Sequence, residues 1–196
     1  MLTRTRGWSG RASEGGLTLV ELMMVLAIGM LVMGLAIGGV PAMLRTSRAD
    51  GGLAELASAV RGARELSISN RRNMRLTFGA NTITITRVEY CASPCTPSTT
   101  TMRTITLEGR AQFQLVSGLP DTPDGFGNAS ATNVGSYTPV MFTTDGSFID
   151  SNGDVRNASL FVAIPGDLLS ARAVTIFGAT GAVHLWKWNG RAWVEA

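Results

Sequence analysis

Few side chains of this sequence have the types and spacing that catalysis requires. His184 is the single histidine, and its imidazole could serve as a general base because it titrates near neutral pH. No nucleophile can be assigned to it from the sequence, and neither a nucleophile elbow nor a phosphate-binding loop is present. We therefore expect no enzymatic activity and no cofactor.

Three oxygen-bearing side chains, Asp150, Asn152 and Asp154, follow one another at two-residue spacing. Such a series can wrap a calcium ion when the loop turns sharply. The complete calcium loop is absent, because Gly153 stands at the fourth position instead of the sixth and Phe161 occupies the twelfth, where a glutamate belongs. We favour a solvated hairpin tip with local turn bonds, with a weak calcium site as the alternative.

Aromatic and basic residues gather at the end of the chain: Trp186, Lys187, Trp188, Arg191 and Trp193. Aromatic rings interleaved with cations can stack on bases and contact phosphates. Trp186 and Trp188 would share one face of a strand, which is also how a sheet covers a core or a partner subunit. We favour the core or partner interpretation, and DNA contact through Trp186, Lys187, Trp188 and Arg191 is the alternative.

The two cysteines, Cys91 and Cys95, lie close together in a turn-rich stretch. With no other cysteine and one distant histidine, a structural zinc site would lack ligands. A disulfide between them is favoured if the domain lies outside the cytoplasm, and two reduced thiols in an exposed loop are the alternative.

The overall charge gives no separate support for nucleic-acid binding. The chain has 196 residues and a formal net charge of +3. Arg4, Arg6 and Arg11 against Glu14 place most of that excess in the first 16 residues. The remainder is nearly neutral and produces no strong field.

A long apolar run follows these arginines. Between Leu17 and Leu44 the only ionisable side chain is Glu21. A helix over this run would be about 42 Å long, against a bilayer hydrocarbon core of about 30 Å. The preceding arginines favour a cytoplasmic N-terminus, although Arg45 and Arg48 weaken the asymmetry. A lone carboxylate in such a helix is costly and therefore needs a partner or a role, unless it reaches the membrane interface.

The small residues that mark a cleavage site precede the apolar run instead of following it. Gly15 and Gly16 separate the basic leader from the helix, whereas an ordinary secretory signal is cut after its apolar stretch. From Gly16 to Ile28 the sequence closely resembles the class III signal of type IV prepilins and pseudopilins. The resemblance implies cleavage between Gly16 and Leu17 by a prepilin peptidase, then N-methylation of Leu17.

The same resemblance gives Glu21 a role, since it would be the fifth residue of the mature chain. There the family's glutamate is thought to face the terminal amine of a neighbouring subunit in the filament. Leu17 departs from the phenylalanine that is commonest at its position.

The rest of the chain predicts an α+β fold. Leu53, Leu56, Val60 and Ala63 recur at helical spacing, which predicts an amphipathic helix reaching about Asn70. Alternating runs predict strands at 75–78, 82–90, 102–107, 111–116, 140–143, 159–164, 173–177, 182–188 and 192–195. Residues 120–137 predict a surface-exposed loop, and hairpin turns are expected at 180–181 and 189–190.

Two segments narrow the resemblance to the H-type minor pseudopilins of type II secretion and the FimT or FimU minor pilins. They are residues 63–71, and residues 142–147 followed by strands ending in 178–183. This resemblance implies a minor pseudopilin of the type II secretion pseudopilus, acting at the tip in assembly priming. The alternative is a type IV pilus minor pilin for pilus assembly or DNA uptake.

The expected organisation has four parts: a cytoplasmic leader at 1–16 that is removed, a transmembrane and filament-core helix at 17–44, a periplasmic amphipathic helix at 45–72, and a β-rich head at 73–196. The resemblance implies a single-pass protein of the bacterial inner membrane with its N-terminus in the cytoplasm and its head in the periplasm. Its partners would be prepilin peptidase, other pseudopilins or pilins in a hetero-oligomeric filament, and inner-membrane lipid. Nucleic acid is not favoured.

Overall fold

The computed structural model of the chain describes residues 18–37, 40–89, 98–134 and 139–196, without the side chains of 35–43. The chain divides into two compact units, residues 1–41 and 42–196. Helix α1 (Leu19–Ile37) belongs to the first unit. Helix α2 (Val40–Asn70) lies, apart from its first two residues, in the second unit, which we call the head.

Helix α2 supplies the spine of the head. Leu53, Leu56, Val60 and Ala63, the predicted apolar stripe, are buried, which confirms the periodicity. The helix ends where Arg71 turns to a left-handed φ of 52°. There the Arg72 N–H donates to the Ser67 carbonyl at 3.2 Å, and the Arg71 N–H donates to that of Ile68 at 3.3 Å. These two bonds satisfy carbonyls that a helix end otherwise leaves unpaired.

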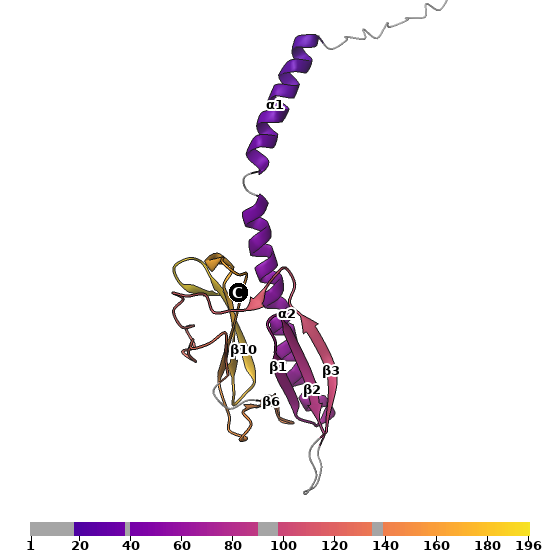
Figure 1. Cartoon of the computed structure of the whole chain (residues 1–196), viewed down its shortest axis with the longest axis vertical. Helices are drawn as coiled ribbons and strands as arrows, with labels where there is room; N and C mark the ends of the chain where they lie inside the picture. Colours follow the sequence, from indigo (N-terminus) through magenta and orange to yellow (C-terminus); the bar gives the residue numbers. More distant parts are fainter. Residues whose placement is uncertain (1–17, 38–39, 90–97, 135–138) are drawn as a thin grey trace, which may run out of the picture. The chain divides into compact units, whose positions relative to one another are not determined.

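The first sheet of the head is antiparallel and has the strand order β3-β2-β1-β6-β7. Its strands are β3 (Thr99–Thr106), β2 (Thr82–Val88), β1 (Met74–Phe78), β6 (Val140–Phe142) and β7 (Phe148–Ile149). Strands β1 to β3 run alongside α2 (Figure 1). Met74, Leu76, Ile83 and Ile85 alternate along β1 and β2 and join the α2 stripe in one buried cluster.

The second sheet, also antiparallel, has the order β11-β10-β9-β8-β4, and β5 pairs with β8. Its strands are β11 (Trp193–Glu195), β10 (Ala182–Trp188), β9 (Arg172–Phe177), β8 (Ala158–Ala163), β4 (Gln112–Phe113) and β5 (Thr132–Asn133). A short 3-10 helix, η1 (Leu168–Ser170), precedes β9. Every residue of β8 is buried, as expected of a strand covered on both faces.

Two apolar clusters hold the head together. The larger joins α2 to both sheets. The smaller lies on the second sheet around Phe161, Trp188 and Trp193. The α+β prediction is therefore confirmed, with one helix packed on antiparallel sheets.

The structure corrects three details of the predicted head. Strands β5 and β7 were not predicted, because a two-residue strand shows no alternation. The strand expected at 111–116 shrinks to β4. In the loop predicted to be exposed at 120–137, the described residues 120–134 are partly buried, since Thr122 and Val134 are 3% and 4% exposed. A turn-forming composition predicts the lack of regular structure but not how the segment packs.

Candidate functional site

Helix α1 begins with a side-chain cap that places Glu21 in its first turn. The Glu21 N–H donates to the Thr18 hydroxyl at 3.3 Å, and the Leu22 N–H donates to the Thr18 carbonyl at 3.1 Å. A carboxylate in the first turn of a helix is stabilised by the helix dipole. Gly16 and Leu17, the predicted cleavage and methylation residues, lie outside the described residues.

The surface of α1 is apolar all round. Every described side chain from Leu19 to Gly34 is exposed, including Leu19 at 74% and Met30 at 72%. Glu21 is the one ionisable side chain of this helix. A helix that is apolar on all sides needs an apolar environment outside itself.

No helix in the described part of the chain combines the length and hydropathy needed to cross a membrane.

In the head, a buried arginine joins the second sheet to α2. Arg172 is 3% exposed, and its Nε donates to Asp50 Oδ1 at 2.9 Å. Its Nη1 donates to the carbonyls of Leu169 and Ala171, each at 2.9 Å. Lys187 Nζ lies 3.5 Å from the same Asp50 oxygen. The guanidinium therefore binds the helix through Asp50 and the η1 segment through the two carbonyls, and it holds the start of β9 against both.

The structure divides the aromatic and basic cluster that the sequence had grouped. The indoles of Trp188 and Trp193 lie in the core, 5.4 Å apart between ring centroids. Lys187 is held by Asp50, and Arg191 stands exposed in the β10–β11 turn. Because the two most buried rings are covered, they present no face on which a base could stack.

Trp186 belongs to a separate polar cluster centred on Asp124, which is 12% exposed. The Trp186 Nε1–H donates to Asp124 Oδ2 at 3.0 Å, and the Thr175 hydroxyl donates to the same oxygen. His184 Nδ1 lies 3.3 Å from Asp124 Oδ1. Asp124 thus ties the loop before β5 to β9 and β10. Sequence analysis missed Asp124 because nothing in its local pattern marks it.

The candidate calcium residues form a turn closed by an ion pair. Asp150 is 1% exposed and accepts hydrogen bonds from the N–H groups of Asn152 at 2.8 Å and Asp154 at 3.1 Å. Arg156 Nε donates to its other oxygen at 2.9 Å. Burial of the carboxyl raises its pKa, but these hydrogen bonds outweigh that effect and lower the pKa of Asp150 overall. In the described part of the chain no three acidic, histidine or cysteine side chains converge to hold a metal.

The turn between β6 and β7, within the segment 142–147, carries a second ionised aspartate. The Thr143 hydroxyl, and then the N–H and hydroxyl of Ser147, lower the pKa of Asp145 to about 2. Gly146 follows with a φ of 85°, and its carbonyl accepts from Arg64 Nε at 3.3 Å. This bond fastens the turn to α2.

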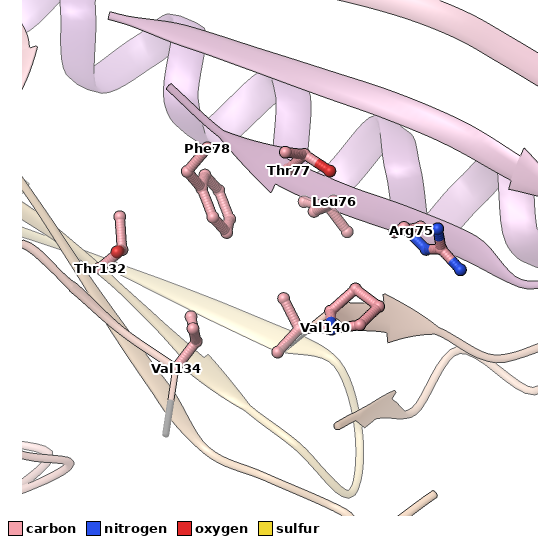
Figure 2. A pocket seen from close by; sticks show the side chains of 8 residues that line it. Arg75, Leu76, Thr77, Phe78, Thr132, Val134 and Val140 are labelled. Carbon is pink, nitrogen blue, oxygen red and sulfur yellow. The ribbon is translucent and has the colours of Figure 1, made fainter. Parts of the chain in front are cut away.

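A cleft of about 440 Å³ opens between β1 and the strands β5 and β6. Figure 2 shows Leu76 and Phe78 of β1 opposite Val134 and Val140. Its lining contains Arg75 but, among the described residues, no carboxylate, histidine or cysteine. The described lining of the cleft therefore offers apolar contact, the hydroxyls of Thr77 and Thr132, and one cation.

The predicted pair Cys91 and Cys95 lies outside the described residues.

Comparison with known proteins gives one finding. Residues 11–37 match the family model of the prokaryotic N-terminal methylation motif. The match ends at Ile37, the last residue of α1, and does not extend into the head. Neither a curated protein nor a solved structure matches the chain.

Proposed function

We propose that this chain, which resembles type IV pilins in its methylation motif and its α+β arrangement, is a minor pseudopilin of a type II secretion pseudopilus. It acts as a structural subunit of the tip that primes filament assembly for secretion across the outer membrane. The observation that carries the proposal is the motif at residues 11–37, which places a peptidase signal directly before an apolar helix with one carboxylate.

In this proposal α1 serves first as an inner-membrane anchor and then as the filament core. Its apolar surface supports both roles, since lipid or neighbouring helices would cover it. The head, with a disulfide between Cys91 and Cys95, lies in the periplasm. The match to the motif points to a structural subunit and not to an enzyme.

Cleavage gives Glu21 its partner. Hydrolysis of the peptide bond between Gly16 and Leu17 releases the leader and leaves a positively charged amine on Leu17. In a filament, this amine on one subunit pairs with the Glu21 carboxylate of its neighbour. Two charges that are each costly in an apolar core become tolerable together.

Processing provides the direct test. Co-expression with a prepilin peptidase should give a mature chain that begins with methylated Leu17 by intact mass. A bulky side chain at the scissile bond should block cleavage, so Gly16→Val should retain Met1 and the leader. Gly15→Ala, one residue earlier, is the matched control and should be cleaved. A wild-type chain that keeps its leader in the presence of active peptidase would contradict the proposal.

The alternative is a type IV pilus minor pilin that takes up DNA, and the exposed Arg191 is the observation in its favour. DNA affinity measured against salt concentration distinguishes the two roles, because phosphate contacts weaken as salt rises. If the chain is a pseudopilin, we expect weak DNA binding. The double variant Lys187→Gln with Arg191→Gln should then bind DNA as weakly as the wild type. Salt-dependent binding that the double variant abolishes would favour the minor pilin.

A further inference from the structure

A turn and two strand ends of the head pack around the start of α2. On one side is the turn at 108–110, where a Cβ placed on Gly109 would lie 2.6 Å from the Cβ of Arg48. On the other side, Asp50 holds Arg172 and Lys187, which lie at one end of β9 and β10. This end of the head is therefore built from the first turns of α2 and from strand ends beside it.

The helix η1 and the β10–β11 turn complete the same end. The Arg172 guanidinium donates to the Leu169 carbonyl at 2.9 Å, and the Trp188 N–H donates to the Ala171 carbonyl at 3.1 Å. A Cβ on Gly190 would lie 3.3 Å from Leu169 Cδ2. Figure 1 shows η1 at the end of the head where α2 enters. We call segments 44–50, 108–110, 167–171 and 187–192 the basal surface.

The basal surface is basic and carries two exposed leucines. All its residues are described, and its exposed charged side chains are Arg45, Arg48, Arg110, Arg191 and Glu108. The remaining charged groups are internally satisfied: Asp50 by Arg172 and Lys187, and Asp167 by the Leu169 N–H at 3.0 Å. Leu168 and Leu169 are 42% and 59% exposed. This combination of cations and exposed apolar side chains is typical of surfaces that bind anionic lipid.

The covalent chain keeps this surface close to the apolar run. Leu44 ends that run, and α2 is helical from there to Asp50. Six residues of helix span about 9 Å, which is comparable to the Debye length of about 8 Å at physiological salt. If the apolar run ends at a bilayer surface, Arg45 and Arg48 lie within the range over which headgroup charge acts.

We propose that the basal surface docks onto an anionic lipid bilayer, with the four arginines against lipid phosphates and Leu168 and Leu169 in the interfacial layer. The inference rests on the proposed membrane anchor and adds a second contact, one that seats the head before the subunit enters a filament. Incorporation into a filament then requires the head to leave the lipid surface.

Hydrogen exchange of the full chain in vesicles tests the docking. Vesicles of phosphatidylcholine alone are compared with vesicles that also contain phosphatidylglycerol. We expect the amides of 166–171 and 189–192 to exchange at least about fivefold more slowly in the anionic vesicles. A fivefold change is roughly what the attraction of one arginine to an anionic lipid surface would produce. Leu168→Ser with Leu169→Ser, and separately Arg110→Gln with Arg191→Gln, should remove most of this protection.

Matched controls lie elsewhere on the head. Arg61→Gln with Arg103→Gln removes the same charge from exposed positions away from the basal surface, and Val155→Ser removes an exposed apolar group near the opposite end of β8. Both should keep the protection. The exchange of β8 and β9 reports whether each variant is folded, and the wild-type comparison between vesicles is decisive even if a basal variant unfolds.

Vesicle flotation separates failure of the inference from failure of the proposed function. A chain that floats with both vesicles but shows equal exchange in the basal segments contradicts docking and leaves the anchor standing. If the control variant with Arg61→Gln and Arg103→Gln also loses the protection, the basal surface is not the site of docking. A chain that floats with neither vesicle contradicts the anchor, and the docking inference with it.

Discussion

The carboxylate of the first helix and three carboxylates of the head differ in whether they have partners within the chain. In the described residues, no side chain forms a hydrogen bond or ion pair with the Glu21 carboxylate on α1, which stands on an otherwise apolar surface. In the head, Asp50, Asp124 and Asp150 each have two or more partners. The fold of the head therefore provides partners for these three carboxylates, whereas the Glu21 carboxylate remains available for the filament contact proposed above.

The separation along the chain shows how the head achieves this. Asp50 meets Arg172 across 122 positions, and Asp124 meets Trp186 across 62. Such pairs exist only once the sheets have packed, so they contribute to the stability of the folded head. In the proposed filament, a carboxylate without such a partner can instead contribute to contacts between subunits. Four predictions test this division, in order of decreasing effect.

The largest effect is expected for Glu21→Gln. In the proposed filament this substitution leaves the Leu17 amine of the neighbouring subunit without a carboxylate. An unpartnered charge in an apolar interior costs about 3–5 kcal/mol, so incorporation into filaments should fall by more than about 100-fold. Quantifying the subunit in sheared filaments against the membrane fraction measures this. Glu21→Asp should restore part of the incorporation, and the thermal midpoint of the head should not move. Normal incorporation of the Gln variant would remove the contrast between the two regions.

In the head, Asp50→Ala should lower the free energy of unfolding by about 2–4 kcal/mol, because it leaves the buried Arg172 without its carboxylate. Urea unfolding followed by tryptophan fluorescence measures the loss. The control is Asp154→Ala, whose carboxylate is 65% exposed and 3.6 Å from Arg156; this exposed pair should contribute less than about 1 kcal/mol. Equal effects of the two substitutions would show that burial does not determine the value of these pairs.

Asp124→Ala should cost about 1–3 kcal/mol. It removes the acceptor of the Thr175 hydroxyl and leaves the Trp186 Nε1–H with its other acceptor, Thr175 Oγ1 at 3.2 Å. The loop from Leu119 to Val134 should also become more susceptible to proteolysis. Asp124→Asn retains one acceptor oxygen and should lose less. Unchanged cleavage of this loop in the Ala variant would indicate that its apolar contacts alone hold it.

The smallest effect is a dependence of stability on acid. The pKa values of Asp145 and Asp150 are lowered in the folded head, so both favour folding above the ordinary aspartate pKa of about 3.9. Their contribution is lost as pH falls from there through the folded-state values, which for Asp145 is about 2. Urea unfolding between about pH 6 and pH 2 should show this decline. Asp145→Asn with Asp150→Asn should flatten it, whereas Glu21→Gln should leave it unchanged.

The sequence by itself determined the features that depend on neighbours along the chain. The apolar run with Glu21 and the stripe from Leu53 to Ala63 are periodic over many residues, so the helices were predictable. Most strands were found for the same reason. The N-terminal methylation motif, a local arrangement of glycines, charges and apolar residues, was also visible without a structure.

Only the tertiary structure decided which polar groups meet. Asp124 lies in an irregular loop, and no local pattern shows that it binds Trp186 and Thr175. Likewise, the aromatic and basic cluster of the sequence separated into core indoles, a lysine held by Asp50 and an exposed Arg191. Alternation along a strand determines which side chains share a face. Which segments cover that face is decided by packing, because those segments are distant in the sequence.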